Sequence, residues 1–228
     1  MCNLQTRQMH SAQRFRFCLQ LVEKHMPQLH SPFATRYPQY VLLELSDAES
    51  QAHASTLLEA VATAAIEQGW VRDAVVASSL TQSEALWALR EHISMAQAAE
   101  GKNIKHDIAV PISRIADFIA DTDDLLRQRF PGCRMVTFGH LGDGNLHYNV
   151  SAPLGEDDQV FLQQQAAVNQ CVHDQVHQFG GSISAEHGLG ALKREEIRRY
   201  KSGTEMDMMM AIKRALDPHN LMNPGKVL

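Results

Sequence analysis

The spacing of apolar residues divides this chain into short strands and longer helices. Apolar residues three and four apart, from Phe15 to Met26, predict an amphipathic helix over residues 11–26 that ends before Pro27. Runs of aliphatic and β-branched residues predict strands at 40–45, 73–77, 105–110, 134–138, 146–150 and 182–184. Helical patterns are found at 47–69, at 81–101, from Pro111 through Leu126, and at 156–179, 192–200 and 205–216. Asp47 is the predicted cap of the first of these helices, and Thr81 and Glu84 form a predicted capping box for the second.

This order of elements favours an α+β fold. Alternating strands and helices usually indicate a parallel sheet, but a tight turn between residues 138 and 146 requires an antiparallel pair. We therefore expect a mostly antiparallel sheet with helices packed on one face, in the ferredoxin-like β-α-β-β-α-β manner, followed by C-terminal helices. Residues 1–36 are interpreted as an interdomain helix and linker, and residues 37–228 as one domain.

Composition narrows the function classes. The 228 residues are 44% hydrophobic and 21% charged, with a net charge of −5, so no basic field for nucleic acid is present. No apolar run approaches the ~18 residues of a membrane span. The four cysteines, Cys2, Cys18, Cys133 and Cys171, form no Cys-x-x-Cys pair, which is typical of reduced thiols. A cytoplasmic protein is expected, with peripheral membrane association left open.

The predicted hairpin at 138–149 carries the first candidate site. If its turn is centred on Asp143 and Gly144, His140 and His147 are directly opposed, with Cβ atoms ~5 Å apart, and can share a metal ion. Asn149, two residues beyond His147, lies on the same face. The alternative is a hydrogen-bonded pair of histidines without metal. Asp143 itself is expected to bond its own backbone in the turn.

A second glycine-rich segment, at 180–190, contains Glu186 followed by His187. With His140 and His147, Glu186 would complete a set of two histidines and one carboxylate that leaves positions open on zinc, manganese or iron. His106 is left unassigned. The other histidines are interpreted as bystanders: His10, His25, His30, His53, His92, His173, His177 and His219.

Two further patterns receive structural interpretations. The alternating charges from Lys193 to Arg199 are typical of a solvated helix face. The methionines between 206 and 210 are expected to pack in the core from the last helix.

Three motifs carry a resemblance to a known family: residues 140–149, 180–190 and 216–226. They resemble the C-terminal half of the FAD-linked 2-hydroxy-acid dehydrogenases and oxidases of the vanillyl-alcohol-oxidase flavoprotein superfamily. That family includes D-lactate dehydrogenase, the glycolate oxidase FAD subunit and D-2-hydroxyglutarate dehydrogenase. The resemblance extends from about Tyr40 to the last residue, and it implies that residues 37–228 are a substrate-binding cap domain.

The resemblance also implies roles for individual residues. His140, His147 and Glu186 would hold zinc or manganese, and His187 would be the base that takes the hydroxyl proton while hydride passes to FAD. Asn149 would orient the α-carboxylate of the substrate. The residues for a second, distal carboxylate would be Arg90 and Ser94, four apart on one helix, and Lys105 on the next strand. Asn223 would lie in a C-terminal tail that faces the flavin.

No glycine-rich phosphate-binding loop for the flavin is found in these residues. The expected cofactors are therefore a divalent metal on this chain and FAD on an N-terminal flavin-binding domain or subunit that is absent here. Further expected partners are a dicarboxylic 2-hydroxy acid such as D-2-hydroxyglutarate and an electron acceptor, either a protein or a quinone. The chain alone is expected to bind without turnover.

Two other functions remain open from the sequence. A stand-alone metal-dependent hydrolase would use the same ligands, with His187 as acid or base. A vestigial or regulatory binding domain would be expected to have lost a ligand. Adding a flavin-domain polypeptide and an electron acceptor would distinguish a hydrolase from an oxidoreductase, because the activity of a hydrolase depends on neither.

Overall fold

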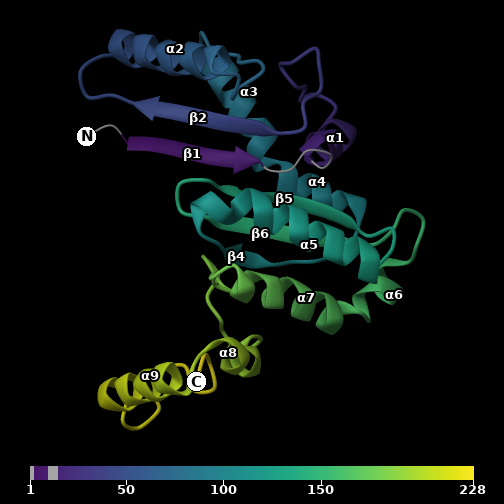
Figure 1. Cartoon of the computed structure of the whole chain (residues 1–228), viewed down its shortest axis with the longest axis vertical. Coiled ribbons are helices and arrows are strands. Elements are labelled where there is room, and N and C mark those ends of the chain that lie inside the picture. The colour runs from purple at the N-terminus through teal and green to yellow at the C-terminus, as the bar shows by residue number, and fades with distance from the viewer. Residues whose placement is uncertain (1–2, 10–14) are drawn as a thin grey trace.

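The computed structural model describes residues 3–9 and 15–228 (Figure 1). The first predicted helix is present as α1 (Phe15–His25), and the part of that prediction at residues 11–14 lies outside the described residues, as does His10. A short strand precedes it, β1 (Asn3–Met9), which the sequence pattern did not predict because only Leu4 and Met9 in it are strongly apolar.

The sheet is antiparallel throughout the described residues. Its strands are β1, β2 (Tyr40–Ser46), β3 (Asn103–Ile104), β4 (Asp107–Ala109), β5 (Arg134–His140) and β6 (Asn145–Ser151). The strand order is β2-β1-β5-β6-β3, and β4 also pairs with β6. The predicted α+β class with an antiparallel sheet is confirmed. The strand predicted at 105–110 is two short strands interrupted at Lys105 and His106.

Helices make up much of the remaining chain. Their bounds are α2 (Gln51–Glu67), α3 (Leu80–Glu91), α4 (Ile93–Glu100), α5 (Ile115–Arg129, after a 3₁₀ turn at Ile112–Arg114), α6 (Asp158–Leu162), α7 (Gln165–Gln178), α8 (Arg194–Tyr200) and α9 (Gly203–Leu216). The two long helices predicted at 81–101 and 156–179 are each broken in two.

Helices cover both faces of the sheet, so the prediction of one covered face is incomplete. Alternation along β5 sends Met135 into a core with α5 and α7, and Val136 and Phe138 into a second core with α1, α3 and α4. Figure 1 shows α5 lying across β5 and β6 on the near side of the sheet. Each face of the central hairpin is therefore packed, which holds its strands in place.

Three predicted details are wrong. Residues 73–77 form no strand; Val75 and Val76 instead line a surface cavity beside α3. The caps of α2 and α3 are Ser50 and Ser79, whose hydroxyls accept backbone N–H groups, in place of Asp47 and Thr81. The short strand at 182–184 is reduced to one bridge between Ala109 and Ser182. At 182–184 the Ser182 hydroxyl donates to the Ser184 carbonyl, a local bond that competes with strand pairing.

Of the two C-terminal helices, α8 contributes a residue to a core and α9 does not. Figure 1 shows α8 and α9 below the body of sheet and helices. Ile197 anchors α8 in the core, whereas α9 has no buried residue. Its Met208 is 62% exposed and its Leu216 is 73% exposed. The prediction that the methionines of this helix pack in the core is therefore wrong, and α9 presents an uncovered apolar face.

Glu100 joins α1, α4 and β5 through three side-chain partners. Its carboxylate accepts from Lys24 Nζ at 2.6 Å, His25 Nε2 at 2.8 Å and Arg134 Nη1 at 2.9 Å. Burial raises the pKa of Glu100, but these partners outweigh burial and lower the pKa to about 2. A carboxyl group whose pKa falls on folding stabilises the protein above its unfolded pKa of 4.5, and that stability is lost as pH falls toward 2.

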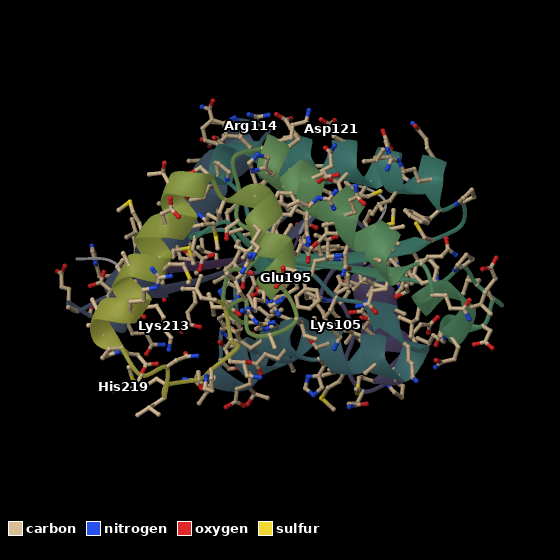
Figure 2. All side chains as sticks on the ribbon, turned by 90° about the horizontal axis from the view of Figure 1, so that it is seen from below. Lys105, Arg114, Asp121, Glu195, Lys213 and His219 are labelled. Carbon is tan, nitrogen blue, oxygen red and sulfur yellow. The ribbon has the colours of Figure 1, made fainter. Side chains whose placement is uncertain are left out.

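We therefore expect Glu100→Gln to lower the free energy of unfolding at pH 7. Below pH 4 the free energies of unfolding of the variant and the wild type should lie closer together. Urea unfolding at pH 7, 5 and 3 measures both effects. Glu195→Gln is the matched control, because Glu195 is 78% exposed and pairs only weakly with Arg198 at 3.7 Å (labelled in Figure 2). Parallel pH profiles for wild type and Glu100→Gln would contradict this assignment.

Candidate functional site

The β5–β6 hairpin places its two histidines on one face but not opposite each other. Phe138 pairs with His147, and His140 pairs with Asn145. The prediction that His140 and His147 are directly opposed is therefore wrong, because the turn has four residues, 141–144, and is centred one residue earlier. The carboxylate of Asp143 accepts the N–H of Asn145 at 2.9 Å, which confirms its structural role. His140 lies diagonal to His147, at the end of its strand.

His147 is the centre of the site. Its ring packs against Phe138, with centroids 4.9 Å apart, and β4 places Asp107 beside it in register. Burial lowers the pKa of His147, and Asp107 and Glu186 only partly oppose this effect. The imidazole is therefore neutral at pH 7, which is the form that binds a metal.

Asp107 fixes the loop that carries Glu186 and His187. One of its carboxylate oxygens, Oδ2, accepts the backbone N–H groups of Ala185 at 3.2 Å, Glu186 at 2.8 Å and His187 at 2.8 Å. Burial raises the pKa of Asp107, but the N–H groups and the nearby His187 ring outweigh it, so the pKa lies below its ordinary value. Asp107 is thus ionised and binds three consecutive amides, much as an anion is held in a backbone nest.

Four chemically active side chains converge as a result. Ligand atoms of Asp107, His147 and His187 all lie within 4.8 Å of one another. Glu186 Oε2 lies 3.8 Å from His147 Nε2. The set differs from the predicted one, because Asp107 joins it and His140 is not part of the described close group. Such a donor set of imidazoles and carboxylates fits zinc or manganese.

Two buried polar side chains support this fit. Asp107 is 4% exposed, and its Oδ1 has no hydrogen-bond partner among the described residues. Asn145 is 2% exposed, and neither its Nδ2 nor its Oδ1 is paired within the same part of the chain. Strand alternation places Asn145 on the same face as His147. Buried polar atoms without partners are costly, so a bound ion or ligand beside them would satisfy what the protein leaves open.

Two of the predicted substrate residues lie on this face. Arg90, 8% exposed at the end of α3, holds its guanidinium 4.9 Å from the Phe138 ring and lowers the pKa of His147 through its charge. Asn149 is buried and donates to Gln97 Oε1 at 2.8 Å. A cation and an amide therefore flank the histidine, as anion binding requires.

The other predicted site residues lie apart. Ser94 is exposed on α4, beyond the break at His92, so it does not share one continuous helix with Arg90. Lys105 is exposed between β3 and β4 (labelled in Figure 2) and does not begin a strand. Asn223 is exposed in the C-terminal tail, where its φ of 47° is in the left-handed region.

Sequence reasoning missed Asp107 and Asn145. Asp107 follows a histidine inside an otherwise apolar strand, and a carboxylate buried in a strand needs partners. That signal was present, but the partners come from a loop almost eighty residues later. His173, interpreted as a bystander, is also buried, and its Nδ1 lies 2.5 Å from Glu196.

Comparison with known proteins places this chain in a family. The model of the FAD linked oxidases, C-terminal domain, matches residues 14–227. The chain belongs to this family of FAD-linked oxidases, and the resemblance seen in its motifs is confirmed.

Particular relatives share one name. The D-2-hydroxyglutarate dehydrogenase of Stutzerimonas stutzeri (strain A1501) is 39% identical over 197 residues, which are 86% of this chain and 42% of that protein. The mitochondrial D-2-hydroxyglutarate dehydrogenase of Danio rerio is 37% identical over 216 residues, 92% of this chain and 38% of that protein. That of Arabidopsis thaliana is 34% identical over 211 residues, 92% of this chain and 36% of that protein. The chain thus spans about two fifths of the length of these relatives. None of the described helices has the length and apolar character to cross a membrane.

Proposed function

We propose that this chain is the metal- and substrate-binding part of an FAD-dependent D-2-hydroxy-acid dehydrogenase. The observation that carries the proposal is the convergence of His147, Glu186, His187 and Asp107 at one end of the central hairpin. Family membership adds the flavin chemistry. The flavin would be bound by a part of the enzyme outside these residues, and the uncovered apolar face of α9 is a surface against which such a part could pack.

The metal would be held by His140, His147 and Glu186, with Asp107 and His187 next to them. His140 lies on the same face as His147, one pair closer to the turn. A divalent ion bound there would act as a Lewis acid that lowers the pKa of the substrate hydroxyl group. FAD, when bound, would accept the hydride from the α-carbon.

The residues of this chain would perform the remaining steps. His187, whose side chain is 68% exposed, is open to a substrate and would accept the hydroxyl proton. Asp107 would hold that imidazole in place, since its Oδ2 lies 3.8 Å from His187 Nδ1 and also binds the His187 N–H. Asn149 would orient the α-carboxylate.

The substrate would be a dicarboxylic acid such as D-2-hydroxyglutarate. Arg90 supports this proposal, because its buried guanidinium lies on the face of His147 and can pair with a second carboxylate. Ser94 and Lys105, both exposed, would approach the distal carboxylate from the rim. The names of the relatives point to the same acid.

Calorimetric titration of the manganese-loaded chain tests this specificity. D-2-hydroxyglutarate is expected to bind at least ~10-fold more tightly than D-lactate, because a buried guanidinium–carboxylate pair contributes more than 1.4 kcal/mol. Arg90→Met should remove this preference. The matched control is Arg114→Met, since Arg114 also stacks on a phenylalanine, 4.5 Å from the Phe179 ring, but at the outer edge of the molecule (Figure 2). Equal affinity for the two acids in wild type would eliminate the role given to Arg90.

A further inference from the structure

The loop that carries Glu186 and His187 is anchored at two points. Asp107 binds its amides from the side of β4. The second anchor is Lys193, whose Nζ donates to the carbonyl oxygen of Ile183 at 2.5 Å. Ile183 is buried in the core, three residues before Glu186.

Lys193 is not the solvated helix residue that its charge pattern predicted. Burial lowers the pKa of its ammonium group, and the carboxylates of Asp107 and Glu196 oppose that shift. Burying an ammonium group is costly unless its charge is paired and its N–H groups are hydrogen-bonded. Here the charge faces two carboxylates and the donor binds the loop backbone.

Helix α8 holds Lys193 in position. Lys193 is the residue just before α8, and its N–H donates to Leu189 O at 3.2 Å. Glu196, in the first turn of the helix, contacts His173 of α7 at 2.5 Å, and Tyr200 donates to Asp174 of α7 at 2.9 Å. The anchor therefore connects the loop to the rigid α7 side of the core.

We infer that Lys193 is a positioning residue: together with Asp107 it clamps the 183–187 backbone so that Glu186 and His187 face His147. This inference rests on the proposed function in one respect, since the clamped side chains are the proposed ligand and base. Without the ammonium group, the Ile183 carbonyl loses its donor and the Asp107 carboxylate loses a favourable charge interaction. The loop should then open more often, and the metal should bind less tightly.

Two measurements on the full chain test the clamp: amide hydrogen exchange of Ala185, Glu186 and His187, and titration with Co²⁺ followed by its visible absorption. Lys193→Met should accelerate exchange at these three amides and weaken Co²⁺ binding ~10-fold, the usual effect of losing support behind a ligand. Lys193→Arg, which retains a cationic donor, should restore most of the slow amide exchange and most of the Co²⁺ affinity.

The controls separate this inference from a general loss of stability and from the proposed function. Lys201→Met removes an exposed lysine at the other end of α8 and should change neither measurement. Slow amides of α5, such as Phe118 and Ile119, report global unfolding within the same sample. If Lys193→Met fails to fold, Lys193→Gln, whose shorter and uncharged side chain also removes the ammonium group, replaces it with the same expected changes.

If the amides of residues 185–187 exchange as slowly in Lys193→Met as in the wild-type chain, the clamp is overturned. That result would leave metal binding by the wild-type chain, and the proposed function, intact. Conversely, a wild-type chain that binds no Co²⁺ would refute the proposed metal site, and hydrogen exchange would still decide whether Lys193 holds the loop.

Discussion

Replacing His147 with alanine is expected to abolish metal binding, with a loss of at least ~100-fold in affinity for Zn²⁺ or Co²⁺. The reason is that His147 belongs to both sets of ligands that the geometry allows. It lies in the close group with Asp107 and His187, and it is 3.8 Å from Glu186. Its imidazole is also neutral at pH 7, because burial lowers its pKa. Equilibrium dialysis with metal analysis measures the loss.

His219→Ala is the matched control, because His219 is exposed in the tail (Figure 2) and should not affect binding. Two further variants distinguish the ligand sets. If His140, His147 and Glu186 hold the metal, His140→Ala should weaken binding more than Asp107→Asn, which retains an acceptor for the loop amides. The reverse order would place Asp107 among the ligands. Metal binding by His147→Ala at wild-type affinity would eliminate both sets.

Tyr148→Phe is expected to lower the free energy of unfolding by about 2–3 kcal/mol. Tyr148 is fully buried on the α5 side of β6, and its hydroxyl donates to Asp123 of α5, which is 2% exposed. Hydrogen bonds to buried charged groups are among the strongest in proteins. The variant removes the donor and leaves the carboxylate in the core, so the hairpin that carries His147 loses its bond to α5. Urea unfolding at pH 7 measures the change.

Tyr200→Phe provides a control with the same chemistry at the surface. Tyr200 donates to Asp174 at 2.9 Å, and Asp174 is exposed, so water can replace the lost partner. A change of less than about 1 kcal/mol is expected. Equal losses in the two variants would show that burial of Asp123 adds nothing to the stability of the hairpin.

The elements of this fold were largely predictable because each face of the sheet buries apolar residues. Alternation along residues 134–138 and 146–150 identified both hairpin strands, and they are present as β5 and β6. The pairing register of these two strands could not be predicted as well as the strands themselves. It depends on a four-residue turn whose aspartate, Asp143, bonds the N–H of Asn145, and sequence spacing cannot distinguish this from a two-residue turn.

The helix boundaries failed for a related reason. Ser50 and Ser79 cap α2 and α3, although Asp47 and Thr81 also have good capping chemistry. Several candidate caps within a few residues are nearly equal in energy, so other local contacts decide among them. Asp47 illustrates this, because it lies before the helix and its carboxylate accepts the N–H of Glu49 at 2.7 Å and contacts the His53 ring at 2.5 Å.

The site was half predictable. Motif spacing identified Glu186 and His187 and the hairpin histidines, and the structure brings three of these four together. Asp107 and Lys193 escaped because their partners are distant in sequence or are backbone groups, which no residue pattern encodes. Such supporting residues become visible only when hydrogen bonds of the folded loop are counted.

The dependence of hydroxy-acid binding on metal tests the central proposal most directly. D-2-hydroxyglutarate would be titrated calorimetrically into the full chain, once after removal of metal with a chelator and once after loading with Mn²⁺. The proposal predicts binding to the loaded chain, and no measurable binding to the metal-free chain or to loaded His147→Ala. Equal binding with and without metal, or no binding to the loaded chain, would contradict it.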